Sequence, residues 1–251
     1  MKRLAAVGCM FVLNACSSPK DAAVATDAAA PVEDTAPVED TAPWLTYPEG
    51  PYGLKVGETF PNFSFKGYKD GTGEWTDISM IDYYDPDGTR GINGIYWVVS
   101  AQWCPPCREE AKILPGMLDR LYRPRGARFA TAMIQDNKRN PATQLTVDQW
   151  LAAYKLNFDI VLDDEPQTLP SSGTVGLPYN YVINPRDMKV YRIVQGVNPD
   201  ATTIPALSSM LTKNGAPPLA TDAATSTDVG TSTDSGTATD TGLAPTDATA
   251  D

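Results

Sequence analysis

The sequence predicts an α/β domain over residues 52–213, with a mixed central sheet flanked by helices, between two disordered acidic flanks. Apolar, β-favouring runs alternate with segments of helical periodicity in this range, an order that gives parallel strand pairs with helices on both faces. A final pair of strands joined by a short turn adds antiparallel strands. Residues 19–43 and 214–251 hold no aromatic residue and are rich in small, polar and acidic residues, so we expect no packed core there.

The domain is expected to open with two short strands, over residues 63–65 and 74–78, which pair as an N-terminal β-hairpin extension around Asp70 and Gly71. The run Ile-Tyr-Trp-Val-Val at residues 95–99 follows, and such a run is typical of a buried strand. The antiparallel extension therefore precedes the first central strand.

A helix is expected to begin at the Cys-Pro-Pro-Cys segment, residues 104–107, directly after this strand. Proline is tolerated in the first turn of a helix, and Glu109 and Glu110 favour the positive end of its dipole. Apolar residues then recur at helical spacing, and Pro115 among them predicts a kink rather than an end. These apolar residues are Ala111, Leu114, Leu118 and Leu121.

The rest of the domain continues the alternation and closes on an antiparallel pair. The expected elements are a strand over residues 127–134, a helix over 147–154 with Thr146 as its cap, a strand over 158–162, two antiparallel strands over 179–183 and 189–194, and a helix over 202–211. After the N-terminal extension, the order is therefore β-α-β-α-β-β-α.

The N-terminus has the features of an export signal. Two basic residues precede a short apolar run over residues 4–13, which is too short to span a bilayer but suits the core of a signal peptide. The segment Leu-Asn-Ala-Cys that ends at Cys16 resembles a bacterial lipobox, in which the cysteine is lipidated and becomes the first residue. Residues 1–15 are therefore interpreted as a signal peptide and Cys16 as a lipid anchor. Ordinary cleavage, which would leave Cys16 as a free thiol, is the alternative.

The two flanks are expected to be disordered and acidic. Residues 16–51 form a spacer with a direct repeat of Ala-Pro-Val-Glu-Asp-Thr, and residues 19–43 within it carry a charge of −5, which extends the chain by self-repulsion. Residues 214–251 carry −6 from their aspartates and form a solvated tail. The middle, residues 44–213, carries only −2 of the total −11, which excludes a basic footprint for nucleic acid.

Two cysteines three positions apart, Cys104 and Cys107, carry the chemistry of the domain. The chain has no histidine, which removes Cys–His catalysis and histidine metal sites. A single Cys-x-x-Cys pair without histidine fits neither a zinc site nor haem attachment, and a disulfide across two residues closes too short a loop to stabilise the fold much. A strand followed by Cys-x-x-Cys at the start of a helix indicates a redox pair. An idle or regulatory disulfide is the alternative.

The helix N-terminus predicts which cysteine is the nucleophile. Free backbone N–H groups and the positive dipole end stabilise a thiolate at Cys104 and lower its pKa. We expect Cys104 to be the exposed member that attacks substrate disulfides. Cys107, one turn further on, would resolve the mixed disulfide.

Trp103 and the Cys-Pro-Pro-Cys segment resemble the active site of the thioredoxin superfamily, in particular of the membrane-anchored, extracytoplasmic TlpA/ResA-like thiol–disulfide reductases. The similarity runs from Val56 to Leu211 and implies a thioredoxin fold. Its other motifs are Gly-Glu-Thr-Phe-Pro-Asn-Phe at 57–63, Cys-Arg-Glu-Glu at 107–110, Gly-Leu-Pro at 176–178 and Tyr-Val-Ile-Asn-Pro at 181–185. The chain departs from the pattern at Lys112, where these proteins often carry a proline, and in a longer loop over residues 167–174.

The resemblance implies roles for four residues around the cysteines. Pro178 would be cis and face the disulfide, and the backbone of Leu177 would pair with a bound peptide. Glu110 would be a buried acid of raised pKa that exchanges protons with the cysteines; a solvated residue in the first turn is the alternative. Trp103 would pack beside the cysteines and shape access to them.

These features predict a membrane-anchored enzyme, a thiol–disulfide oxidoreductase that exchanges the Cys104–Cys107 pair with substrate proteins, as a reductant. We expect an extracytoplasmic monomer without cofactor or metal. A lipid would anchor it to a bacterial membrane, with the periplasmic side of the outer membrane as one candidate. A separate membrane electron donor would reduce its disulfide again. The alternatives are a peroxiredoxin-like thiol peroxidase, whose signature is not met because Ala101 lies three before Cys104, and a non-enzymatic redox-sensing or copper-binding module.

Overall fold

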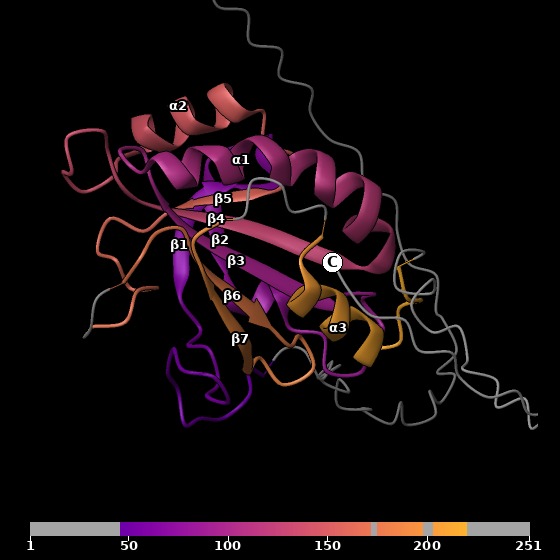
Figure 1. The fold of residues 1–251 in the computed structure, drawn as a ribbon. Coiled ribbons are helices and arrows are strands. Elements are labelled where there is room, and N and C mark those ends of the chain that lie inside the picture. The colour runs from indigo at the N-terminus through magenta and orange to yellow at the C-terminus, as the bar shows by residue number, and fades with distance from the viewer. Residues whose placement is uncertain (1–45, 172–174, 198–202, 220–251) are drawn as a thin grey trace, which may run out of the picture. The chain divides into compact units, whose positions relative to one another are not determined.

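The structure is a computed structural model and describes residues 46–171, 175–197 and 203–219. Its centre is a seven-stranded mixed sheet with the strand order β2-β1-β5-β4-β3-β6-β7 (Figure 1). The strands are β1 (Ser64–Tyr68), β2 (Thr76–Ser79), β3 (Gly94–Ala101), β4 (Ala127–Gln135), β5 (Asp159–Leu162), β6 (Tyr179–Ile183) and β7 (Val190–Gln195). The α-helices are α1 (Pro105–Met117), α2 (Gln144–Tyr154) and α3 (Pro205–Lys213). The predicted mixed α/β class is confirmed.

Strand β3 is an interior strand, next to the middle strand β4, and is buried along its whole length. It pairs in parallel with β4, which pairs in parallel with β5, as expected for strands joined through helices. On its other side β3 pairs antiparallel with β6, and β6 pairs antiparallel with β7. An all-apolar or aromatic run such as β3 suits this position because both faces of the strand are covered.

The predicted N-terminal hairpin is confirmed, and it joins the main sheet. Strand β1 pairs antiparallel with β2 and, along its other edge, antiparallel with β5. The connection includes Asp70 and Gly71, both with positive φ (51° and 64°). Glycine is required at position 71, because a Cβ atom there would lie 2.0 Å from the carbonyl oxygen of Leu156.

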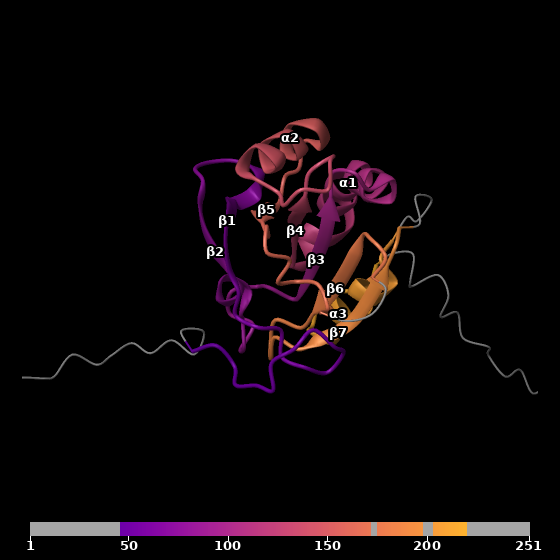
Figure 2. The ribbon, with the colours of Figure 1, turned by 90° about the vertical axis from the view of Figure 1, so that its left-hand side faces the viewer.

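Helices α1 and α2 lie on the same face of the sheet (Figure 2). The Tyr96 hydroxyl on β3 contacts Glu110 of α1, and the Tyr68 hydroxyl on β1 contacts Asp148 of α2; the strand register places both tyrosines on one face. The steps from β3 to β4 and from β4 to β5 cross the sheet in the same direction. Right-handed connections then place both helices on one side.

Helix α3 packs on this face as well, which corrects the expectation of helices on both faces. Leu207 and Leu211 lie against Gly94, which is two residues from Tyr96 on β3 and so points to the same side. The opposite face is covered instead by the N-terminal segment, here residues 60–83, whose Phe60, Phe65 and Tyr83 rings lie near Trp97. No helical or strand periodicity in this segment predicted that it would pack on this face.

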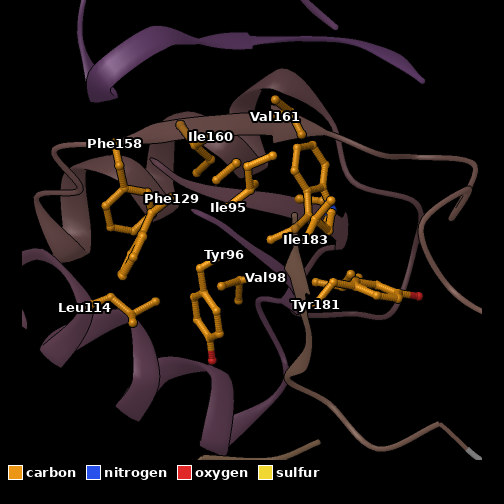
Figure 3. Close-up of a cluster of buried hydrophobic side chains, with 14 of the residues drawn as sticks. Ile95, Tyr96, Val98, Leu114, Phe129, Phe158, Ile160, Val161, Tyr181 and Ile183 are labelled. Carbon is orange, nitrogen blue, oxygen red and sulfur yellow. The ribbon is translucent and has the colours of Figure 1, made fainter. Parts of the chain in front are cut away.

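An aromatic cluster fills the face away from the helices. Trp97 of β3 is fully buried there, with its ring 5.6 Å from that of Phe65, 6.1 Å from that of Phe60 and 6.3 Å from that of Tyr83, between centroids. Figure 3 shows the division: the Tyr96 ring extends towards Leu114 and α1, whereas Tyr181 points away from them. The sheet therefore has an apolar core on each face.

Helix α1 passes through Pro115 and continues into a π-helical turn (Leu118–Tyr122), so the proline does not end the helix, as predicted. The starts of the other two helices differ from the predicted ones. The cap of α2 is Thr143 rather than Thr146, because the Thr143 hydroxyl accepts from the Thr146 N–H while Thr146 bonds back to the Thr143 N–H. Helix α3 begins at Pro205; the predicted start at 202 lies outside the described residues.

The packed domain is longer than the predicted range 52–213. At its start the Tyr47 hydroxyl donates to the carbonyl of Phe60 at 2.6 Å, and at its end Ala216 and Leu219 are buried. The Arg125 side chain donates to the carbonyl of Pro217, which fixes the last described turn. The predicted signal peptide, the lipidated Cys16 and most of both flanks lie outside the described residues. Among the helices that are described, none has the length and apolar character needed to cross a bilayer.

Candidate active site

The Cys-Pro-Pro-Cys segment joins the end of β3 to the start of α1. Cys104 is the N-cap residue of the helix, and its sulfur accepts a hydrogen bond from the Cys107 N–H at 3.2 Å. Pro105 and Pro106 occupy the first turn, where a missing N–H is not needed by the helix. Cys104 and Cys107 form a disulfide with 5.3 Å between their Cα atoms. The predicted redox pair is thus positioned at the positive end of a helix dipole.

The expectation that Cys104 is the exposed cysteine is wrong for this oxidised form. Cys104 is 2% exposed and Cys107 is fully buried. The bond between the two sulfurs and the hydrogen bond from the Cys107 N–H turn the Cys104 side chain back onto the helix end. Residues at helix N-cap positions are commonly solvated. The position of Cys104 in the sequence therefore did not predict that its side chain is buried.

Trp103 lies beside the disulfide and is held on both sides. Its indole N–H donates to the Gln135 side chain at the end of β4, at 2.8 Å. The Arg139 guanidinium carbon lies 3.7 Å from the centre of the Trp103 ring, a cation–π contact. The half-buried ring is therefore fixed next to Cys104, as the resemblance implies.

The loop before β6 has the form that the resemblance implies. The Leu177–Pro178 peptide bond is cis, and Pro178 is buried, with its carbonyl accepting from the Gly196 N–H at 2.8 Å. Leu177 is partly exposed, and within the described residues its backbone has no hydrogen-bond partner. Its N–H and C=O groups are therefore free to pair with an extended peptide.

Glu110 is a buried acid on α1, not a solvated residue of the first turn. It is 3% exposed and lies one turn after Cys107, so the two side chains share a helix face. Its Oε1 atom accepts from the Tyr96 hydroxyl at 3.1 Å and from the Asn180 amide at 2.8 Å. Burial raises the pKa of Glu110 to about 7, and the hydrogen bonds from Tyr96 and Asn180 oppose this shift. A pKa in this range suits an acid that gives and takes a proton near neutral pH.

The titration of Glu110 is expected to make the protein less stable as the pH rises. The folded pKa of about 7 lies above the ordinary value of 4.5, so between these values the folded state binds more protons than the unfolded state. The free energy of unfolding should be highest below pH 4.5 on this account. It should fall by about 3 kcal/mol as the pH rises to 7, from 1.36 kcal/mol per pKa unit.

Urea unfolding at a series of pH values measures this dependence, with Glu110→Gln as the matched variant. Burial also raises the pKa of Asp159, which adds a slope of the same sign, so the difference between the wild type and the variant isolates Glu110. An identical pH slope in both proteins would contradict the assignment.

Four side chains that complete the site were not predicted from the sequence: Tyr96, Gln135, Arg139 and Asn180. Asn180 is a polar residue inside an apolar strand, where asparagine is depleted, and this was the available signal for a buried partner. Arg139 has a positive φ of 66°, a conformation that no local sequence rule assigns to arginine, so its place over Trp103 could not be anticipated.

Comparison with known proteins places the chain in a family. The AhpC/TSA family model matches residues 56–192, more than half of the chain. The chain belongs to the AhpC/TSA family. This match runs from before β1 into the first half of β7 and includes the Cys-Pro-Pro-Cys segment, Glu110 and the cis-proline loop.

Two curated relatives of this AhpC/TSA chain are named thiol-disulfide oxidoreductase ResA. It is 25% identical over 147 residues to thiol-disulfide oxidoreductase ResA of Bacillus subtilis, covering 56% of this chain and 77% of the relative. It is 28% identical over 144 residues to ResA of Oceanobacillus iheyensis, covering 57% of this chain and 66% of the relative. A secreted thiol-disulfide isomerase from Corynebacterium glutamicum aligns with a TM-score of 0.47 and 13% identity, over 62% of this chain and 86% of that structure.

These findings confirm the predicted resemblance to ResA-like proteins and the predicted enzyme class. The chain is a Cys-x-x-Cys thiol–disulfide oxidoreductase. Its relatives carry that name, and its Cys104–Cys107 disulfide at a helix N-terminus is the group that this activity requires.

Proposed function

We propose that this protein is a lipid-anchored, extracytoplasmic reductase of protein disulfides. The observation that carries the proposal is the Cys104–Cys107 disulfide. It links the N-cap residue of α1 to the first turn of this helix, which also carries the buried Glu110. A pair closed across two residues adds little to stability, and the buried acid has a pKa near neutrality, so the arrangement suits electron and proton exchange.

The reductive reaction would proceed in two exchanges. The Cys104 thiolate attacks one sulfur of a substrate disulfide, forms a mixed disulfide and releases the other substrate sulfur as a thiolate. Cys107 then attacks the Cys104 sulfur, which restores the Cys104–Cys107 disulfide and releases the second substrate thiolate. Two electrons pass to the substrate, and Glu110 takes the proton that Cys107 gives up.

Trp103, Leu177 and Pro178 would form the substrate contact. The backbone of Leu177, which has no hydrogen-bond partner within the described part of the chain, supports pairing with an extended peptide that presents its disulfide to Cys104. The ring of Trp103, held by Gln135 and Arg139, would bound the approach to the cysteines.

The anchor and the location rest on the N-terminal sequence. The basic start, the short apolar run and the Leu-Asn-Ala-Cys segment support export, lipidation of Cys16 and residence outside the cytoplasm. A separate membrane protein would return electrons to the pair, since the pair is oxidised at the end of each cycle.

The reduction potential of the Cys104–Cys107 couple tests the direction of electron flow. We would equilibrate the chain against glutathione or thioredoxin and read the thiols by alkylation, with Cys16→Ser so that lipidation does not interfere. A value near that of thioredoxin, about −270 mV, supports the reductant role, whereas a value near that of DsbA, about −120 mV, overturns it. Peroxide consumption at a rate above that of insulin reduction would favour the peroxidase alternative instead.

A further inference from the structure

Two buried oxygen atoms in the active site have no hydrogen-bond partner among the residues that the structure describes. They are Oε2 of Glu110 and Oδ1 of Asn180. The two side chains are already joined, because the Asn180 amide donates to Oε1 of Glu110 at 2.8 Å. A buried acceptor without a partner is costly, and two of them on one hydrogen-bonded pair call for a common cause.

One proton on Glu110 would supply the donor that both atoms lack. A carboxylate oxygen and an amide oxygen are both acceptors and cannot bond to each other, whereas a protonated carboxyl group has a hydroxyl donor. We propose that Glu110 is the neutral acid while Cys104 and Cys107 are joined, with its Oε2 hydroxyl donating to Oδ1 of Asn180. Asn180 donates back to Oε1, so the planar carboxyl and carboxamide groups form a cyclic pair. Asn180 is then a positioning residue that fixes the site of the proton.

The surroundings of the pair favour this state. From β3, the Tyr96 hydroxyl donates to Oε1, and burial raises the pKa of Tyr96 well above 10, so it stays neutral. On α1, Cys107 is bonded to Cys104 and has no proton to exchange. From β6, Asn180 does not titrate. Across the described part of the chain, no charged side chain contributes to the pKa of Glu110, which is raised mainly by burial.

The pair would store a proton for the opening of the disulfide, a role that rests on the proposed function. A dithiol that reduces the pair supplies two electrons and releases its two protons to solvent. The Glu110 O–H bond then breaks and a Cys107 S–H bond forms, while Cys104 remains a thiolate. The new carboxylate keeps two donors, the Asn180 amide and the Tyr96 hydroxyl, so Asn180 supports both protonation states.

Infrared difference spectroscopy of the oxidised full chain tests the pair directly. The spectrum of the wild type minus that of Glu110→Gln isolates the band of Glu110. A pH of about 5.5 is used because it lies between the ordinary pKa of a glutamate and the raised pKa of about 7, so only a Glu110 with a raised pKa is protonated there. We expect an acid carbonyl band at the low frequency of a group that both accepts and donates hydrogen bonds. Asn180→Leu should move this band to higher frequency. Tyr181→Phe is the control, because it removes a buried hydroxyl bond on the same strand that does not touch Glu110.

A second measurement needs no substitution at Asn180 and so does not depend on how that variant folds. The side-chain amide resonances of Asn180 in the oxidised wild type should titrate with the same midpoint as the Glu110 acid band. The absence of an acid band, a band unchanged by Asn180→Leu, or Asn180 resonances that ignore this titration would each overturn the proposal. None of these readouts uses thiol exchange, so their failure would leave the proposed reductase function standing, and loss of disulfide reduction alone would leave the pair intact.

Discussion

Replacing Cys104 with serine is expected to abolish disulfide exchange, with a loss of roughly 10³-fold or more, as when a catalytic nucleophile is removed from other enzymes. A serine hydroxyl does not attack a disulfide at neutral pH, whereas a thiolate at a helix N-cap does. The reduction of insulin disulfides by dithiothreitol, with and without the protein, measures the loss.

Cys107→Ser is the matched variant and should behave differently. It keeps the sulfur that attacks but lacks the one that resolves, so it should accumulate a mixed disulfide with a disulfide substrate, visible on a non-reducing gel. Cys104→Ser should trap none. The reverse result, a mixed disulfide trapped by Cys104→Ser alone, would assign the attack to Cys107 and contradict the dipole argument.

Replacing Trp97 with alanine is expected to lower the free energy of unfolding by about 3–5 kcal/mol, the range for removing a large aromatic side chain from a core. Trp97 is fully buried, and its ring contacts three aromatic rings from the N-terminal segment. The substitution therefore leaves a cavity and also loosens the cover of the face that carries no α-helix. Urea unfolding followed by circular dichroism measures the change.

Leu145→Ala provides the comparison for this experiment. Leu145 is a large apolar residue in α2 but is 62% exposed, so its loss should change the free energy of unfolding by no more than about 0.5 kcal/mol. A cost at Trp97 as small as that at Leu145 would mean that the N-terminal segment does not pack on β3 as the structure shows.

Strand β3 and the Cys-Pro-Pro-Cys segment were predictable because their sequence signals are local. The run at 95–99 has no polar interruption, and the cysteines stand directly after it, so both the buried strand and the helix that follows could be derived from spacing alone. The cis-proline loop and Glu110 came from resemblance rather than from spacing, and the structure puts Glu110 in the interior and Pro178 in the cis form.

The remaining features depend on contacts between distant segments, which local patterns do not encode. Asn180 meets Glu110 only because β6 lies beside β3, and Trp97 meets Phe60 only because the N-terminal segment folds under the sheet. The extra residues that complete the domain, to Leu219, are held by Arg125, which ends the 3-10 turn (Arg123–Arg125) before β4. The burial of Cys104 likewise accompanies its disulfide with Cys107, and the position of Cys104 in the sequence does not predict it.

The strand order also constrains the sequence of events in which the chain can fold. Strand β1 closes the sheet against β5, with Lys66 opposite Leu162, so the N-terminal hairpin cannot complete its edge until most of the domain has emerged. Strand β3 likewise waits for β6 on one side, while its partner β4 arrives early. Pairings between such distant segments slow folding and leave strand edges open in the meantime. A chain that emerges N-terminus first therefore leaves one edge of β1 and one edge of β3 open until β5 and β6 arrive.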